Sequence, residues 1–324
     1  MKDLSVIIVS YKGWNRLMKC LESLNLFTGN VFSHEIIVVD NSSDTDFHEI
    51  EKKYPGFRYV YNPVNGGFAN GCNLGAGIAT GEFLLFLNPD TVVLETEIGK
   101  LLASAKQNPE YYILSCRQIN EKGKESRAWG QFPHIWNLTG LQRALAKIFK
   151  RAKTDDSNHE IIFPEWVSGS VMMIRKEIFQ DISGFDEDFW MYYEDVDLCR
   201  RIHNTGGRIA FLRDITVEHN HGGSSRINVR TYSVTKTEVF ISKHVYIGKH
   251  TNGLERFSAQ VFLVCNNLLT GLLSSLPGVI FFFVPAIFKR SVAFTRLMSY
   301  YLNALLRLTW ISPQSVNYRK DELR

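Results

Sequence analysis

Several kinds of site are missing from this 324-residue sequence. Its five cysteines are scattered, with no Cys-x-x-Cys pair and no metal spacing, which excludes a zinc ribbon or a disulfide framework and favours a reducing compartment. No Gly-Lys-Ser/Thr sequence occurs, so there is no P-loop, and no Gly-x-Gly-x-x-Gly follows the first predicted strand. The net charge of +4 is too small to indicate a nucleic-acid partner.

Charge is also missing from one long stretch of the chain. Between Arg256 and Lys289 lie 32 uncharged residues, and no acidic residue occurs from Phe257 through Lys320. At the other end, Met1-Lys2-Asp3 leads straight into an apolar run, so we expect no signal peptide.

Short apolar runs alternate with helical patterns in the N-terminal part of the chain. Strands are predicted over residues 4–9, 35–39, 58–61 and 82–87, with helical segments between them, notably residues 70–79. Strands that alternate with helices pair in parallel through right-handed crossovers. The sequence therefore predicts an α/β fold, with a doubly wound, mostly parallel sheet and helices on both faces.

Two acidic groups interrupt this pattern. Asp90 follows the strand that ends at Asn88-Pro89, and the carboxyl ends of strands are where open α/β sheets bind ligands. Further along comes Tyr193-Glu194-Asp195-Val196-Asp197. An oxygen ligand for a hard metal, together with a carboxylate able to take a proton, indicates chemistry on a phosphorylated substrate. A turn aspartate and a helix cap are the alternatives.

A glycine-rich loop over residues 65–73 follows the third predicted strand and opens a helix. Glycine lets the backbone approach a ligand, and a helix N-terminus attracts phosphate. A purely structural turn explains the loop equally well.

Taken in order, these segments resemble the inverting family 2 glycosyltransferases, which have the GT-A fold, and especially their rhamnosyltransferase-like branch. The resemblance covers roughly residues 4–225. The matching segments are Val9-Ser10-Tyr11, Val38-Val39-Asp40-Asn41-Ser42, Asn65-Gly66-Gly67-Phe68 with Asn73, Leu87-Asn88-Pro89-Asp90, Trp166-Val167-Ser168-Gly169-Ser170, Gly184-Phe185-Asp186, Glu194-Asp195-Val196-Asp197-Leu198, and His219 near Gly222-Gly223-Ser224.

The resemblance implies a domain layout and two sets of binding residues. A GT-A catalytic domain would cover residues 1–240, with a nucleotide-sugar half over about 1–115 and an acceptor half over about 116–240, followed by a helical region over 241–324. Asp40 would hold the nucleobase. The implied donor-binding residues are Ser10, Tyr11, Asp40, Asn65, Gly67, Phe68, Asn73, Asn88 and Asp90. Those implied on the acceptor and diphosphate side are Trp166, Ser168, Gly169 and Glu194, with Trp166 also explicable as a core aromatic.

The resemblance further implies a divalent metal, Mg²⁺ or Mn²⁺, on the donor diphosphate. Asp90 corresponds to the last aspartate of the family's Asp-x-Asp motif, whereas Asn88 stands where the first aspartate often lies. That leaves one carboxylate instead of two. His219, after a predicted strand over residues 215–217, would complete the metal site, and His221 competes for the same role.

In the same way, Glu194-Asp195 resembles the Glu-Asp motif whose aspartate is the general base. Asp195 would take the proton of the acceptor hydroxyl in line with departure of the diphosphate, which gives single displacement with inversion. Glu194 would orient the acceptor, and Asp197 would pair within its helix. The alternative is that all three are helix-start carboxylates.

Two further segments bear on membrane attachment. Residues 141–151 are predicted to form a basic amphipathic helix that docks on an anionic membrane or packs on the sheet. Residues 268–288 are long enough to cross a bilayer, but a crossing would place Lys289 and Arg290 opposite a domain that needs cytosolic nucleotide-sugar. Pro277 and Pro285 favour a re-entrant pair of short helices. A buried helix pair and a true crossing are the alternatives.

The sequence thus predicts an inverting glycosyltransferase at the cytoplasmic face of the inner membrane. It would move a sugar, L-rhamnose from dTDP-L-rhamnose, to a hydroxyl of a lipid-linked glycan in the synthesis of cell-surface polysaccharide, such as O-antigen or cell wall. Two alternatives stay open: another donor (galactose, glucose or N-acetylhexosamine), and a catalytically degenerate membrane protein that only binds nucleotide-sugar.

Overall fold

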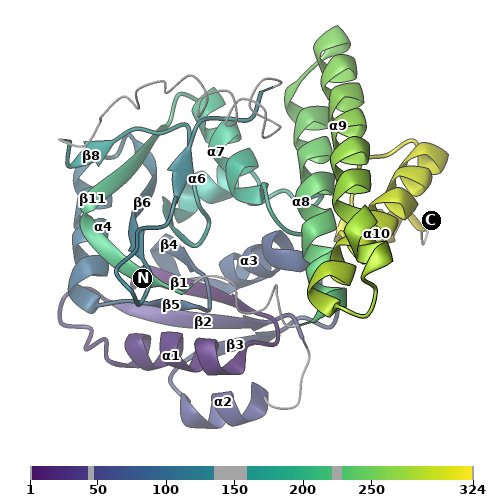
Figure 1. The fold of residues 1–324 in the computed structure, drawn as a ribbon. Coiled ribbons are helices and arrows are strands. Elements are labelled where there is room, and N and C mark those ends of the chain that lie inside the picture. The colour runs from purple at the N-terminus through teal and green to yellow at the C-terminus, as the bar shows by residue number, and fades with distance from the viewer. Residues whose placement is uncertain (1, 43–46, 135–158, 221–227, 323–324) are drawn as a thin grey trace. The chain divides into compact units, whose positions relative to one another are not determined.

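The computed structural model describes residues 2–42, 47–134, 159–220 and 228–322 (Figure 1). The expected basic helix over residues 141–151 and the competing ligand His221 lie outside these ranges. The described residues divide into two compact units. The first contains the sheet, and the second contains residues 188–193 and the helices from residue 228 onward. Residue 240, the expected end of the catalytic domain, falls inside a helix of the second unit.

The first unit is built on a nine-stranded sheet with the order β3-β2-β1-β4-β10-β6-β11-β5, and β8 pairs with β11. The strands β1 to β4 pair in parallel, as do β6 and β11, while β10 is inserted antiparallel between β4 and β6. The predicted mostly parallel sheet is confirmed. Its strands are β1 (Lys2–Ser10), β2 (His34–Asp40), β3 (Arg58–Tyr61), β4 (Gly81–Leu87), β5 (Thr91–Val92), β6 (Tyr111–Ile119), β8 (Ile161–Ile162), β10 (Val171–Arg175) and β11 (Arg208–His219).

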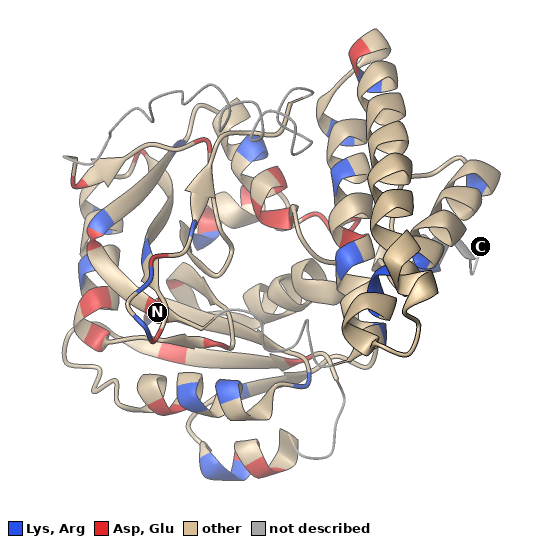
Figure 2. Ribbon diagram, in the orientation of Figure 1, with Lys and Arg blue, Asp and Glu red and all other residues tan. Residues whose placement is uncertain are grey.

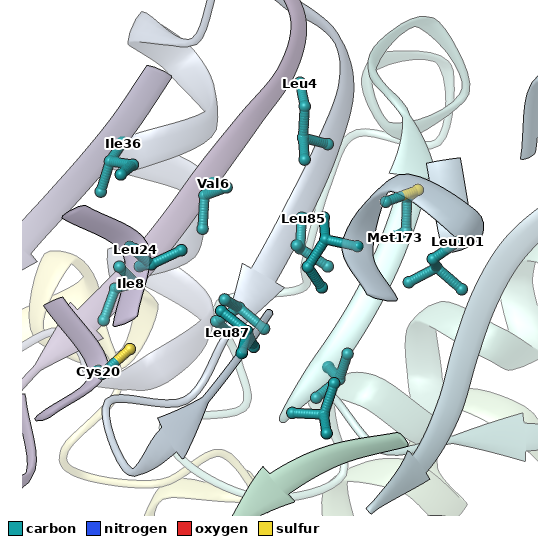
Figure 3. Close-up of a cluster of buried hydrophobic side chains, with 14 of the residues drawn as sticks. Leu4, Val6, Ile8, Cys20, Leu24, Ile36, Leu85, Leu87, Leu101 and Met173 are labelled. Carbon is teal, nitrogen blue, oxygen red and sulfur yellow. The ribbon is translucent and has the colours of Figure 1, made fainter. Parts of the chain in front are cut away.

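One face of this sheet is covered by α1 (Trp14–Asn25), α2 (Phe47–Lys53) and α4 (Glu95–Gln107). Alternate residues of β1, here Leu4, Val6 and Ile8, point into a buried cluster that also holds Leu24 of α1 and Leu101 of α4 (Figure 3). The period of two in a strand therefore decides which β-branched and leucine side chains form this core.

The opposite face of the sheet is covered by α3 (Gly67–Ile78) and α6 (Lys176–Asp181). A Cβ atom on Gly75 of α3 would lie only 2.6 Å from Cγ2 of Ile7, so glycine there lets the helix approach the strand closely. Phe179 of α6 packs on Phe86 with ring centroids 5.1 Å apart. A two-stranded sheet, β7 (Trp129–Gly130) with β9 (Trp166–Val167), and the helix α7 (Glu194–Asn204) complete the described part of this unit.

The second unit consists of α8 (Val229–His250), α9 (Gly253–Ile280), α10 (Pro285–Arg307) and α11 (Val316–Glu322). The helices α9 and α10 form an antiparallel hairpin, in which Ser291 Oγ donates to the Ser275 carbonyl at 2.8 Å and Asn267 Nδ2 donates to Tyr301 Oη at 2.9 Å. Beyond its first turn α9 carries no charge (Figure 2). By length and composition it could cross a membrane.

The hairpin differs from the expected pair of short helices. The two helices have 28 and 23 residues, and the chain reverses at residues 281–284. Pro277 lies inside the last turn of α9, where it removes one main-chain hydrogen bond to the carbonyl of residue 273, yet the helix continues to Ile280. Pro285 opens α10, a position where the missing N–H has no intrahelical partner anyway.

The second unit also holds the short segment 188–193, which comes from the middle of the chain. Asn317 Nδ2 donates to Asp188 Oδ1 at 2.8 Å, and Lys249 forms an ion pair with the same carboxylate. Ser242 Oγ donates to the Met191 carbonyl at 2.9 Å. The segment ends in two consecutive left-handed residues, Tyr192 (φ 73°) and Tyr193 (φ 68°).

Candidate active site

The neighbouring parallel strands β2, β1 and β4 end at the same edge of the sheet and deliver the predicted donor-binding residues there. Ser10 pairs in register with Asp40. Asp40 Oδ1 accepts hydrogen bonds from the main-chain N and the Oγ of Ser42, at 2.8 and 2.6 Å. Among the described residues, Asp40 Oδ2 and Ser10 Oγ are buried without a partner, so both can bind groups of a ligand.

The glycine-rich loop lies beside these strand ends. Gly67 has φ +88°, a left-handed conformation that favours glycine, and the loop is held by Asn65 Oδ1, which accepts from the Gly67 N at 3.1 Å. Asn41 Nδ2 donates to the Gly67 carbonyl at 2.8 Å. The next residue, Phe68, reaches Gly169, where a Cβ atom would lie 3.4 Å from Phe68 Cε1. The loop thus connects the donor side to the 168–170 segment.

Asp90 and His219 meet as the resemblance implied. His219 Nε2 lies 3.1 Å from Asp90 Oδ1 and 3.4 Å from Asn88 Nδ2. Asp90 Oδ2 is 3.4 Å from Nη1 of Arg16, which also donates to the Asn220 carbonyl at 2.6 Å. His219 is buried, whereas the Asp90 side chain keeps some exposure, so the carboxylate is the group that faces outward.

A hydrogen-bond chain behind His219 fixes its orientation. Its Nδ1 lies 2.7 Å from Gln118 Oε1, which also accepts from Ser170 Oγ at 2.8 Å, and Ser170 Oγ is 2.9 Å from Ser168 Oγ. Because Gln118 Oε1 can only accept, Nδ1 donates to it, and Nε2 is left facing Asp90. A bound cation could therefore be shared by His219 Nε2 and Asp90 Oδ1, which lie 3.1 Å apart.

This donor set fits a divalent metal. Two ligands that each lie about 2.1 Å from one ion, at about a right angle, are about 3 Å apart. No group of three or more His, Cys, Asp or Glu side chains forms a metal site within the part of the chain that the structure describes. Asp90 and His219 would therefore leave positions for substrate phosphate, as is usual for Mg²⁺.

Asp195 lies at the start of α7, and two main-chain N–H groups hold it. Gly169 N donates to Asp195 Oδ2 at 2.9 Å, and Val196 N donates to Asp195 Oδ1 at 2.8 Å. Burial raises the pKa of Asp195, although these two hydrogen bonds lower it in part. A carboxylate that is fixed in orientation and made more basic suits proton abstraction.

The two neighbouring carboxylates behave differently. Burial, and then the charges of Asp195 and Asp197, raise the pKa of Glu194 well above its ordinary value, and its Oε2 is buried without a partner among the described residues. Asp197 forms an ion pair with Arg201, Oδ2 to Nε at 2.8 Å, as expected for a pair within the helix. Glu194 is therefore available to a ligand, and Asp197 is not.

Other predicted residues have contacts within the protein. Asn73 Nδ2 donates to the Phe185 carbonyl at 2.8 Å and its Oδ1 accepts from the Phe185 N at 3.0 Å, so it braces that turn. Trp166 Nε1 donates to the Gln131 carbonyl at 2.7 Å, and its ring lies against Gly130. Tyr11 is exposed beyond the end of β1. Direct contacts of these three with substrate stay predictions.

Sequence reasoning missed Gln118 and Arg16. Gln118 lies at the end of β6, so the strand-end rule that selected Asp90 also applied to it. Arg16 lies on α1, and nothing in its local pattern indicates that it reaches Asp90. Ser170 lies in the matching segment that begins at Trp166, but the sequence assigned it no role.

Comparisons with known proteins identify related sequences. The chain is 28% identical over 223 residues to the hexosyltransferase Agl10 of low-salt glycan biosynthesis from Haloferax volcanii, covering 67% of each chain. It is 26% identical to the rhamnosyltransferase WbbL of Escherichia coli, covering 64% of this chain and 79% of that one. It is 28% identical to the N-acetylglucosaminyl-diphospho-decaprenol L-rhamnosyltransferase of Mycobacterium tuberculosis, covering 68% and 77%.

Two solved structures share the fold. The structure of GalNAc-T7 with UDP, GalNAc and Mn²⁺ superposes with a TM-score of 0.53 at 19% identity, covering 77% of this chain and 51% of that one. TarS from S. aureus gives a TM-score of 0.52 at 16% identity, covering 85% and 45%. The chain thus spans about half the length of these two solved proteins.

The sheet with helices on both faces is the GT-A fold, and the protein is a glycosyltransferase. It belongs to Glycosyl transferase family 2, whose sequence profile matches residues 5–183, more than half of the chain. A second profile, the N-terminal domain of galactosyltransferase, matches residues 154–221.

Proposed function

We propose that this protein transfers L-rhamnose from dTDP-L-rhamnose, with inversion, to a hydroxyl group of a lipid-linked glycan in the synthesis of cell-surface polysaccharide. The observation that carries the proposal is the Asp90–His219 pair, 3.1 Å apart, at the sheet edge that also presents Asp40. Rhamnose is favoured by the names of two relatives, and a lipid-linked acceptor by the name of the mycobacterial one.

Donor binding is assigned to the strand ends and the glycine-rich loop. The unpartnered Asp40 Oδ2 would accept from an N–H of the nucleobase, with Ser10 Oγ beside it. The N-terminus of α3, which begins at Gly67, offers main-chain N–H groups to phosphate. Arg16 borders Asp90 and Asn88 borders His219, and both side chains carry N–H donors that favour an anionic group there.

Asp90 and His219 would hold Mg²⁺ or Mn²⁺. When bound, such an ion would neutralise the negative charge that develops on the departing diphosphate. The Gln118 hydrogen bond keeps the His219 lone pair directed at the site.

Asp195 is assigned as the general base. Its carboxylate would take the proton of the acceptor hydroxyl while the Gly169 N–H keeps it oriented. Glu194, with its raised pKa, would donate a hydrogen bond from its protonated form and so orient the acceptor. Ser168 and Trp166 lie on the segment next to Gly169 and are proposed to border the acceptor.

The α9–α10 hairpin is proposed to attach the enzyme to the cytoplasmic face of the membrane without crossing it. Phe281, Phe282 and Phe283 at its tip are 46%, 68% and 69% exposed. Only 22% of the most apolar 18-residue window of α9 is buried, which argues against ordinary core helices. A single crossing would separate α9 from α10 and break the hydrogen bonds between them.

A thermal-shift screen of nucleotide-sugars, with and without Mg²⁺ or Mn²⁺, tests the proposal. dTDP-L-rhamnose with metal should stabilise the protein most. Asp90→Ala should abolish the metal-dependent part, and the exposed Asp214→Ala serves as the matched control. A larger shift with a galactose, glucose or N-acetylhexosamine donor would reassign the donor. A metal response that survives in Asp90→Ala would refute the metal site.

A further inference from the structure

A cavity of about 760 Å³ lies within the second unit, between α8 and α10, and its lining residues all belong to that unit. Part of its wall is apolar, from Val229, Ile241 and Val292. The charged lining residues are Arg230, Glu238 and Arg296. None of these residues belongs to a matched catalytic segment, so the cavity has no role in glycosyl transfer as proposed above.

Most hydroxyl groups of the lining already donate to the protein. Ser233 Oγ donates to the Arg230 carbonyl at 2.8 Å, Thr237 Oγ1 to the Ser233 carbonyl at 2.8 Å, and Tyr300 Oη to the Trp310 carbonyl at 2.7 Å. The two guanidinium groups are therefore the strong donors left for a ligand. Within the described residues, neither Arg230 nor Arg296 forms an ion pair with a carboxylate at contact distance.

Glu238 supplies the complementary charge at the inner end. It is 1% exposed, and its Oε1 accepts from Ser312 Oγ at 3.0 Å. Its Oε2 is buried and has no partner among the described residues. Burial raises the pKa of Glu238 to about 7, although the Ser312 hydrogen bond and the Arg296 charge lower it in part. An unpaired buried carboxylate oxygen is costly, and a ligand that donates to it removes that cost.

The charges are therefore ordered by depth. Glu238 is fully buried, Arg296 is half-buried and Arg230 is exposed. Leu302, Leu305 and Leu306 follow on α10 and are all more than half exposed, so an apolar surface continues along the helix that forms one wall. The arrangement suits a molecule with an inner cationic donor, an outer anion and apolar chains outside.

We propose that this cavity binds the headgroup of phosphatidylethanolamine, with the primary ammonium against Glu238 Oε2 and the phosphate against Arg230 and Arg296. The inference rests on the proposed membrane attachment of this unit. A quaternary choline headgroup has no N–H to donate to Glu238, and a glycerol headgroup brings no positive charge to it. The site therefore discriminates among lipids by the primary amine.

Vesicle flotation of the full-length protein tests the proposal. Vesicles of phosphatidylcholine alone are compared with vesicles in which part of it is replaced by phosphatidylethanolamine, so that the net charge is equal. A charge-assisted hydrogen bond corresponds to about tenfold tighter binding or more, so the ethanolamine vesicles should bind at least about tenfold better. Glu238→Gln should remove this preference and keep binding to phosphatidylcholine.

Two further variants provide a second test and a control. Arg296→Gln removes a contact to the phosphate, so it should weaken binding to the ethanolamine vesicles, and it keeps the test decisive if Glu238→Gln fails to fold. Glu255→Gln, an exposed carboxylate in the first turn of α9, should leave the preference unchanged. Soluble glycerophosphoethanolamine is the last arm. A thermal shift in wild type but not in Glu238→Gln would show that the headgroup is bound without a bilayer, whereas a response to vesicles alone would assign the ligand to the membrane.

Equal binding to both vesicle types, or a preference that persists in Glu238→Gln, would overturn the headgroup site. Failure of the wild-type protein to bind either vesicle type would contradict the membrane attachment itself.

Discussion

Asp195 accepts main-chain hydrogen bonds at both carboxylate oxygens, of which an asparagine can keep only one, and the amide cannot take a proton. Asp195→Asn should therefore retain donor binding in thermal shift while the transfer rate falls by about 10² to 10⁴. Asp214→Asn, the same change at an exposed residue outside α7, is the control. Near wild-type transfer by Asp195→Asn would shift the base assignment to Glu194.

The raised pKa of Asp195 also predicts a pH dependence. The base acts in its ionised form, so kcat/KM should fall as the pH decreases through a value above the ordinary 3.8 of aspartate. A carboxyl with a raised folded-state pKa stabilises the protein below its unfolded pKa, and this contribution is lost as the pH rises through the folded value. The difference in melting temperature between wild type and Asp195→Asn should consequently move in favour of Asp195→Asn as the pH rises, which calorimetry can measure.

Gln118 is hydrogen-bonded to the imidazole of His219 and would act through it on the proposed metal site. Gln118→Met fills a similar volume but cannot accept the Nδ1–H, so Mn²⁺ affinity, measured by calorimetry in the presence of donor, should fall about 10- to 100-fold. Gln107→Met on the exposed end of α4 should leave it unchanged. An unaltered affinity in Gln118→Met would limit Gln118 to a packing role.

The sequence identified the residues with distinctive chemistry more readily than those that support them. Asp90 and His219 stand at strand ends, and their predicted proximity is observed. Gln118 was missed because a buried glutamine gains its role only from the neighbours that the sheet brings to it. Asn73 was predicted to bind the donor, but its amide is hydrogen-bonded to the Phe185 turn. That contact joins residues 112 positions apart, so no local pattern contains it.

Among the elements, α3 contains two glycines whose replacement by alanine should have opposite effects on stability. Gly67, at its start, is left-handed, so Gly67→Ala should destabilise the protein by about 1–2 kcal/mol and weaken donor binding. A Cβ on the exposed Gly77 of the same helix meets nothing within 4 Å, so Gly77→Ala should stabilise it by up to about 1 kcal/mol. Chemical denaturation of both variants measures the contrast. Equal effects would show that neither backbone conformation matters.

The pattern predicted the four parallel strands because each is a short segment rich in apolar, β-branched or aromatic residues. It did not predict that β10, from residues 171–175, is inserted antiparallel between β4 and β6, since strand pairing of this kind depends on contacts far apart in sequence. The start of α3 was expected three residues late because Gly67 and Phe68 are weak helix formers. Near the C-terminus, Pro277 and Pro285 lie close to the end of α9 and at the start of α10, and the chain reverses between them.

For the whole molecule, the exposed tip of the hairpin should decide its partition between membrane and solution. Replacing Phe281, Phe282 and Phe283 by serine removes apolar area valued at about 25 cal/mol per Å², which should weaken vesicle binding by about a hundredfold or more. Leu26→Ser, at a residue that is 76% exposed on the first unit, is the control. Wild-type protein should stay on membranes in high salt and leave them in detergent. Unchanged partition of the triple variant would place the contact elsewhere.

The observed division of the chain also follows from contacts that sequence order conceals. The expected boundary at residue 240 lies inside α8, whereas all of α8 belongs to the second compact unit. That unit also holds the segment 188–193 from the middle of the chain. That segment is short and carries no pattern of its own, so its membership depends on Asp188, Met191 and the side chains of α8 and α11 that bind them.

The membership of residues 188–193 in the second unit has a consequence for any division of the protein. The peptide that immediately precedes Glu194 and Asp195 is held by hydrogen bonds within the helical unit, and it ends in two left-handed tyrosines. A cut between the two units at a single point of the chain would therefore leave residues 188–193 on the wrong side. We expect the first unit, expressed without the helices from residue 228 onward, to lose the contacts that fix the backbone just before α7.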